Sequence, residues 1–189
     1  MNAGADTVKM DKEVPNFTLK DATDKEHSLK DLSRDKKATV LMFISTQCPV
    51  SNAYNERIIA LHNDYKDQGI QFIGINSNRN ESVEEIVEHN KTNKFSFLVL
   101  KDLKNEIADK FVAKRAPEVY LLDDKRILRY RGAIDNSQKN PETHYLRETL
   151  ALVVAGKEIP ENLKKTKAFG CTIKRVRRVR KEPSRDRTP

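Results

Sequence analysis

The stretch "VLMFISTQCPVSNAYNERI" (residues 40–58) decides the fold, because a buried strand, a cysteine and a helix follow one another within it. The apolar run at 38–45 is rich in β-forming residues and predicts a central strand. Apolar residues then recur near helical spacing from residue 52 to residue 67, and Gly69 supplies the stop. A second apolar run, "IQFIGINS" (70–77), predicts another strand. A strand–helix–strand unit of this length makes the two strands parallel.

The remaining segments extend this unit into a mixed-sheet α/β domain. The expected elements, in chain order, are a hairpin formed by 17–21 and 27–32, a helix at 81–93 capped by Ser82, a strand or extended loop at 95–102, a helix at 104–112, an antiparallel hairpin at 117–134, and a helix near 142–155 that ends at Gly156. We divide the chain into a loose start (1–13), one domain (14–158) and a C-terminal extension (159–189).

Composition places the chain among ordinary single-domain proteins. Its 189 residues can bury a real core, and 37% of them are hydrophobic, which argues against disorder. The longest apolar run falls far short of the roughly 18 residues that a membrane span needs. We expect no signal peptide in the sequence as given, which leaves both a cytoplasmic protein and an extracytoplasmic one without its signal open.

The positive charge of the chain is concentrated at its C-terminal end. Residues 174–189 carry eight basic and two acidic side chains, so residues 1–173 hold only +2 of the total of +8. Such a tail is usually solvated, and "VRRVR" (176–180) could alternatively form an edge strand. We therefore expect nucleic acid to be an unlikely partner and base no function on the tail.

Cys48 lies where thiol chemistry is favoured. A free thiol is mostly protonated at neutral pH, but unpaired N–H groups at a helix N-terminus stabilise the thiolate. Pro49 suits the first helical position, because its fixed φ fits there and its missing N–H costs nothing. Ser51 follows three residues later and could donate a hydrogen bond to the sulfur. We expect Cys48 to be a nucleophile rather than an inert buried cysteine.

Four motifs resemble the peroxiredoxin-like branch of the thioredoxin superfamily, the AhpC/TSA or redoxin group. They are "VPNFTLKDATDKEHSLKDL" (14–32), "FISTQCPVSNAY" (43–54), "APEVYLLDDKRILRYRGAIDN" (116–136) and "AFGCTIKR" (168–175). The resemblance spans about residues 13–175 and implies a thioredoxin-like fold, with an N-terminal hairpin before the mixed sheet and a basic C-terminal tail after it.

The resemblance also implies roles for single residues. Cys48 matches the nucleophilic cysteine, and Ser45 matches the hydroxyl that bonds peroxide and thiolate. Pro117 matches the thioredoxin cis-proline, which together with the Cys48–Pro49 step would border the substrate. Arg115 is the nearest candidate for the arginine that stabilises peroxide cleavage. The sequence departs from the peroxiredoxin pattern at Leu41, which replaces a proline, and from thioredoxin at Ser51, which replaces the second cysteine.

Cys171 is the second of the two cysteines and lies in the C-terminal extension. We expect it to resolve an oxidised Cys48 by forming a Cys48–Cys171 disulfide during turnover. The alternative is that Cys171 packs as a small hydrophobe and an external thiol resolves Cys48. The four histidines are scattered without ligand spacing, so we expect no metal site and no cofactor.

Three functions remain open. The first is thiol–disulfide exchange with a disulfide-containing protein or a small thiol, completed by an external thiol reductant. The second is reduction of hydroperoxides, and the third is a redox-inactive binding module. The resemblance to peroxiredoxins implies an arginine at about the position that Pro117 occupies here. Its absence favours thiol–disulfide exchange, because peroxide cleavage needs preorganised donors.

Other polar residues near Cys48 in sequence are expected to have structural roles. His62 lies too far along the helix to act as a base, and Tyr54 is more consistent with packing. Arg57 and the acidic run at 81–89 are expected to be solvated.

Overall fold

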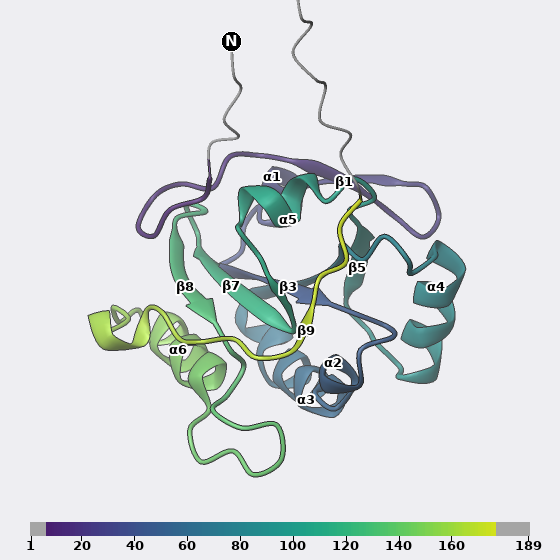
Figure 1. The fold of residues 1–189 in the computed structure, drawn as a ribbon. Coiled ribbons are helices and arrows are strands. Elements are labelled where there is room, and N and C mark those ends of the chain that lie inside the picture. Colours follow the sequence, from purple (N-terminus) through teal and green to yellow (C-terminus); the bar gives the residue numbers. More distant parts are fainter. Residues whose placement is uncertain (1–6, 177–189) are drawn as a thin grey trace, which may run out of the picture.

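The computed structural model describes residues 7–176, which form a mixed seven-stranded sheet with helices on both faces (Figure 1). The strand order is β2-β1-β5-β4-β3-β7-β8. The strands are β1 (Thr18–Asp21), β2 (Glu26–Ser28), β3 (Ala38–Ile44), β4 (Ile70–Asn76), β5 (Leu98–Lys101), β7 (Glu118–Asp123) and β8 (Leu128–Gly132). β3 runs parallel to β4, as the sequence predicted, and its other neighbour β7 is antiparallel to it.

The helices are distributed over the two faces of this sheet. They are α1 (Leu29–Leu32), α2 (Pro49–Asn52), α3 (Asn55–Tyr65), α4 (Val83–Thr92), α5 (Glu106–Lys110) and α6 (Tyr145–Val154), with short 3₁₀ turns η1 (Lys66–Gln68) and η2 (Glu161–Leu163). A separate two-stranded sheet pairs β6 (Arg115–Ala116) with β9 (Cys171–Thr172). This small sheet brings the C-terminal segment across the molecule to the middle of the fold (Figure 1).

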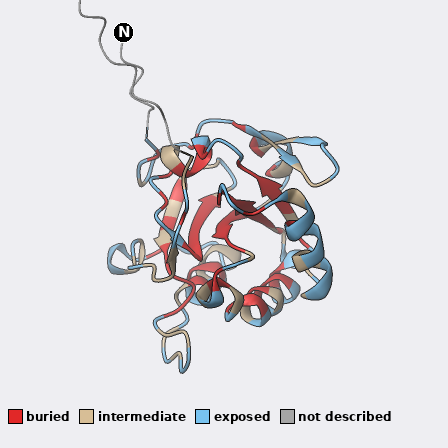
Figure 2. Cartoon of the chain, turned by 45° about the vertical axis from the view of Figure 1, so that its right-hand side comes forward, coloured by how far each residue is buried: buried red, intermediate tan, exposed pale blue. Residues whose placement is uncertain are grey.

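The core lies on both sides of β3, whose seven residues are all buried. Side chains alternate along a strand, so Val40, Met42 and Ile44 pack into one cluster with residues of α3, α4 and α6. Leu41 and Phe43 pack into the other cluster with residues of α5. Figure 2 shows the buried strands enclosed by helices whose outer faces are exposed. Burial on two faces explains the continuous apolar run from which the strand was predicted.

Two expected elements differ from the structure. The predicted helix 52–67 begins earlier and is broken into α2, α3 and η1, because the Tyr54 amide bonds the Ser51 carbonyl in a tighter 3₁₀-type turn. Residues 29–32, expected within a strand, form α1, because the Ser28 side chain caps the Asp31 amide and starts a helix. The hairpins 17–28 and 118–132, the Ser82 cap and the strand at 98–101 are confirmed.

The two ends of the described chain are anchored to the domain. Val8 is buried and its amide bonds the Lys110 carbonyl, while most of residues 7–13 are exposed. At the other end, the Arg175 guanidinium pairs with Asp109. The division into three segments stays a prediction, and the basic tail with the alternative edge strand lies mostly outside the described residues.

Candidate active site

Cys48 occupies the predicted joint between β3 and α2. It is the N-cap of α2 with an extended backbone, and Pro49 is the first residue of this four-residue helix. The Ser51 amide donates to Cys48 Sγ across 3.3 Å. A helix this short has little macrodipole, so this direct N–H contact is the local feature that favours a thiolate.

Cys48 is joined to Cys171 by a disulfide, although 123 residues separate them in the chain. The bond joins the N-cap of α2 to the first residue of β9. Cys48 is only 3% exposed, whereas Cys171 is half-buried. Cys171 is therefore the more exposed residue of the pair.

The segment around Cys171 lies directly against the cis-proline. The Ala116–Pro117 peptide bond is cis, and Ala116 pairs antiparallel with Cys171. Cys48 Sγ lies 3.6 Å from the Ala116 carbonyl oxygen. A Cβ at Gly170 would lie 2.2 Å from that same oxygen, so only glycine fits at this close approach. The chain's own C-terminal strand thus occupies the place beside Pro117 where the resemblance puts substrate.

Among the described hydrogen bonds, none joins the Arg115 side chain to the sulfur of Cys48. It is exposed, and its guanidinium donates to the Gly170 carbonyl and to Thr172 Oγ1 at 3.3 and 3.0 Å. These bonds attach the side chain to both residues that flank Cys171. Arg115 therefore bonds both sides of Cys171 in the disulfide form, and its implied role toward substrate stays a prediction.

The two serines differ from expectation in what they bond. The Ser51 group that donates to the sulfur is its backbone amide, while its hydroxyl accepts from the Ser45 amide at 3.1 Å. The Ser45 hydroxyl accepts from the Cys48 amide at 3.1 Å and donates to Glu81. Because both hydroxyls accept from backbone amides of this loop, the serines shape the turn that presents Cys48.

Glu81 is the site residue that sequence reasoning missed. It was grouped with a solvated acidic face, yet it is 3% exposed and bonds Ser45 Oγ and the Thr46 amide. Glu84, Glu85 and Glu88 of the same run are exposed, as predicted. Its one distinguishing sequence feature is its position before the Ser82 cap, outside the helix proper.

Arg57, expected to be solvated, is only partly exposed. It pairs with the buried carboxylate of Asp135 at 2.7 Å and donates to the carbonyls of Ser137 and Gln138. Tyr54 donates to the same Asp135 carboxylate at 2.9 Å, and its ring packs against Phe169 just before Gly170. Burial and the Asp135 contact both raise the pKa of Tyr54, which keeps this phenol protonated. Tyr54 is thus a packing residue, as expected, and supports the segment that carries Cys171.

His62 lies in the core, away from the cysteines, between the rings of Phe72 and Phe97. Burial, assisted by the nearby Lys66 charge, lowers its pKa, and Asp67 opposes this shift. The unfolded chain therefore binds this proton more tightly than the folded one, so acidification below the ordinary pKa of 6.5 costs stability.

We expect the unfolding free energy to fall less between about pH 7.5 and 5.5 in His62→Leu than in the parent protein. Urea unfolding at a series of pH values measures this slope. His89, whose pKa burial also lowers, remains in the variant, so part of the slope should persist. Equal slopes in both proteins would show that His62 does not titrate on unfolding in this range.

A cavity of about 1120 Å³ lies at the opposite end of the sheet, lined by residues that include Lys37, Asp123 and Lys157. Lys37 immediately precedes β3, whereas Cys48 follows the other end of that strand. The cavity is therefore separate from the disulfide. Within residues 7–176, no cluster of three metal-ligating side chains occurs, and no helix there could cross a membrane.

Comparisons with solved structures place this architecture among thioredoxin-like proteins. An uncharacterised conserved protein of Geobacillus kaustophilus is 29% identical, with a TM-score of 0.83 over 92% of this chain and 95% of its own. Peroxidoxin BcpB of Mycobacterium tuberculosis is 20% identical, with a TM-score of 0.63 over 78% and 97%. A thiol:disulfide interchange protein DsbE of Chlorobium tepidum is 17% identical, with a TM-score of 0.65 over 78% and 99%. The last two likenesses show the fold alone.

The sequence matches none of the curated proteins searched. It does match a family model. The model of the AhpC/TSA family matches residues 10–131, which is more than half of the chain and includes the joint at Cys48 and the cis-proline. The chain, a thioredoxin-like redox protein with an internal disulfide, therefore belongs to the AhpC/TSA family.

Proposed function

We propose that this protein is a thiol–disulfide oxidoreductase in which Cys48 is the nucleophile and Cys171 the resolving cysteine. The observation that carries the proposal is the disulfide between Cys48 at the N-cap of α2 and Cys171 beside the cis-proline. A disulfide that only stabilises the fold would need neither an N–H donor on the sulfur of Cys48 nor a position beside the cis-proline.

The reaction begins with the reduced protein. The Cys48 thiolate attacks one sulfur of a substrate disulfide, forming a mixed disulfide and expelling the other substrate sulfur as a thiolate. Cys171, having given its proton to water or to that thiolate, attacks the Cys48 sulfur and releases the second substrate thiol. The substrate gains two electrons, and the protein ends as the Cys48–Cys171 disulfide.

An external thiol then restores the protein. Because Cys171 is the more exposed residue of the pair, the reductant's thiolate attacks its sulfur and Cys48 leaves as a thiolate. The Ser51 amide stabilises that leaving group. A second external thiol releases Cys171 as a free thiol, which completes a two-electron cycle.

Peroxide reduction is the second candidate, favoured by the family match over residues 10–131. In that reaction the Cys48 thiolate takes one oxygen of a hydroperoxide to become a sulfenic acid, and the alcohol leaves. Condensation with Cys171 yields the same disulfide and water. We rank it lower because among the described contacts no arginine reaches Cys48, while Arg115 is bonded to β9. A redox-inactive binding module ranks last, because it does not require the disulfide.

Stopped-flow mixing of the reduced protein with oxidised glutathione and, separately, with hydrogen peroxide tests these candidates. We expect faster oxidation by the disulfide, and a loss of about 10³-fold or more in Cys48→Ser, since that variant lacks the nucleophile. Cys171→Ser should stop at a Cys48–glutathione mixed disulfide that mass spectrometry detects. Fast peroxide consumption without disulfide exchange would transfer the assignment to peroxidase, and no reaction with either would leave the binding module.

A further inference from the structure

Glu81 receives hydrogen bonds from several donors around the joint at Cys48. Its buried carboxylate accepts from Ser45 Oγ, from the Thr46 amide at 2.8 Å and from Asn76 Nδ2 at 2.5 Å. The Gln47 amide lies further away, at 3.4 Å. Two successive residues of the loop between β3 and α2 are thus bound directly by one side chain from the loop between β4 and α4.

The negative charge of Glu81 is balanced through an amide rather than by direct contact. Lys101 Nζ is buried and donates to Asn76 Oδ1 at 2.9 Å, to the Asn78 carbonyl at 2.7 Å and to the Glu81 carbonyl at 2.6 Å. Asn76 accepts from the ammonium with its oxygen and donates to the carboxylate with its nitrogen. Burying both charges is tolerable because each is fully hydrogen-bonded.

The other end of this chain of bonds is Cys48. The Ser45 hydroxyl, which donates to Glu81, accepts from the Cys48 amide at 3.1 Å. The bonds therefore run without a gap from Lys101 through Asn76, Glu81 and Ser45 to the backbone of Cys48. Among the described residues, none of these side chains forms a hydrogen bond with the sulfur, whose close polar contacts are with the Ser51 amide and the Ala116 carbonyl.

The position requires a carboxylate. Ser45 Oγ, the Thr46 amide and Asn76 Nδ2 all offer hydrogens, and a glutamine side chain has one acceptor oxygen and an NH₂ group that would face one of these donors. Burial alone raises the pKa of Glu81, but the bonds from these three residues outweigh it, and the pKa lies below its ordinary value. The carboxylate is thus ionised where these bonds are formed.

We propose that Glu81 is a positioning residue for the nucleophile, holding the 45–48 loop so that Cys48 Sγ meets the Ser51 amide and the sulfur of Cys171. The inference rests on the proposed role of Cys48. It assigns Glu81 a function that its place in an acidic, helix-flanking run does not suggest. Other charged groups around the network are Lys101 on β5, Asp102 after it, and Glu85 and His89 on α4.

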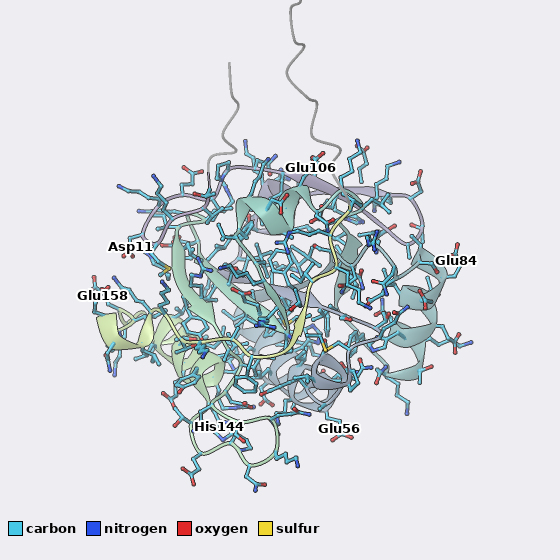
Figure 3. All side chains as sticks on the ribbon, in the orientation of Figure 1. Asp11, Glu56, Glu84, Glu106, His144 and Glu158 are labelled. Carbon is cyan, nitrogen blue, oxygen red and sulfur yellow. A yellow bond between two sulfur atoms is a disulfide. The ribbon has the colours of Figure 1, made fainter. Side chains whose placement is uncertain are left out.

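The test compares Glu81→Gln with Glu84→Gln, which removes an exposed charge at the start of α4 that projects into solvent (Figure 3). The Cys48–Cys171 equilibrium in glutathione redox buffers should shift toward the dithiol by about tenfold or more in Glu81→Gln, because bonds to a charged acceptor are lost. The alkylation rate of Cys48 against pH, measured in a Cys171→Ser background, should report a raised thiol pKa. Glu84→Gln should change neither quantity.

Ser45→Ala keeps the proposal testable if Glu81→Gln folds poorly, because it cuts the same chain of bonds one step closer to Cys48. Its shift in the disulfide equilibrium should have the same sign, and the double variant should be less than additive. A Cys48 thiol pKa that falls in Glu81→Gln would identify a remote charge and overturn the proposal, as would an unchanged equilibrium in both single variants. These measurements need no substrate turnover, so failure of the proposed reaction is scored separately by the stopped-flow assay.

Discussion

Gly170→Ala should weaken closure of the Cys48–Cys171 disulfide severely while leaving the reduced domain folded. A β-carbon at this position would lie 2.2 Å from the Ala116 oxygen and 2.6 Å from its carbonyl carbon. Both are backbone atoms next to the buried Pro117, so the strand itself must move away. Such overpacking typically costs about 1–3 kcal/mol, which is roughly 5- to 150-fold in the closure equilibrium.

Equilibration in glutathione redox buffers, followed by quantification of the cross-linked peptide, measures this effect. Lys167→Ala is the matched control, because it alters an exposed side chain of the same segment and should close normally. The reduced proteins should unfold at the same temperature, since the segment can shift once the disulfide is open. Normal closure in Gly170→Ala would mean that Cys171 reaches Cys48 by a path other than the strand pairing with β6.

Arg57→Met should lower the unfolding free energy far more than Arg147→Met, although the two arginines make the same kinds of contact. Each pairs with an aspartate at 2.7 Å, and each stacks on a tyrosine, Arg57 on Tyr54 and Arg147 on Tyr65. They differ in the burial of the partner carboxylate. Asp135 has a side chain only 1% exposed, against 49% for Asp64.

Loss of Arg57 leaves the Asp135 charge buried without its cation, which costs about 3 kcal/mol. Loss of the exposed pair of Arg147 should cost less than about 1 kcal/mol. Urea unfolding of the two variants gives the comparison. Because Tyr54 bonds Asp135 and packs on Phe169, Arg57→Met should also loosen the segment that carries Cys171, measurable as faster reduction of the disulfide by dithiothreitol. Equal unfolding free energies of the two variants would show that water replaces the arginine as the partner of the Asp135 carboxylate.

Expectations drawn from neighbouring residues agree well with the structure. The apolar runs at β3 and β4 mark strands buried on both faces, and Cys48 with Pro49 marks the start of a helix. Ser82 begins α4 as its predicted N-cap, and the structure adds a capping box with Glu85. These features depend on periodicity and capping within a few residues, so the sequence carries them directly.

Side-chain direction at the site was harder to predict. Glu81 and Arg57 both stand in polar stretches, and nothing local separates them from their solvated neighbours. Glu81 bonds a serine 36 positions earlier, and Arg57 bonds an aspartate 78 positions later. Arg115 could be placed near Pro117 from sequence, but its bonds to the strand of Cys171 cross 55 residues and more.

The sequence by itself determined the parallel βαβ unit, the cap position of Cys48 and the family, because each follows from short-range pattern or motif. Only the tertiary structure decided that Cys171 meets Cys48, that Gly170 must lie against Ala116, and that a buried glutamate holds the loop. Those contacts arise when β9 pairs with β6 and the ends of β3 and β4 come together. Contacts between side chains far apart in the sequence depend on strand order and packing, which the local residue pattern does not specify.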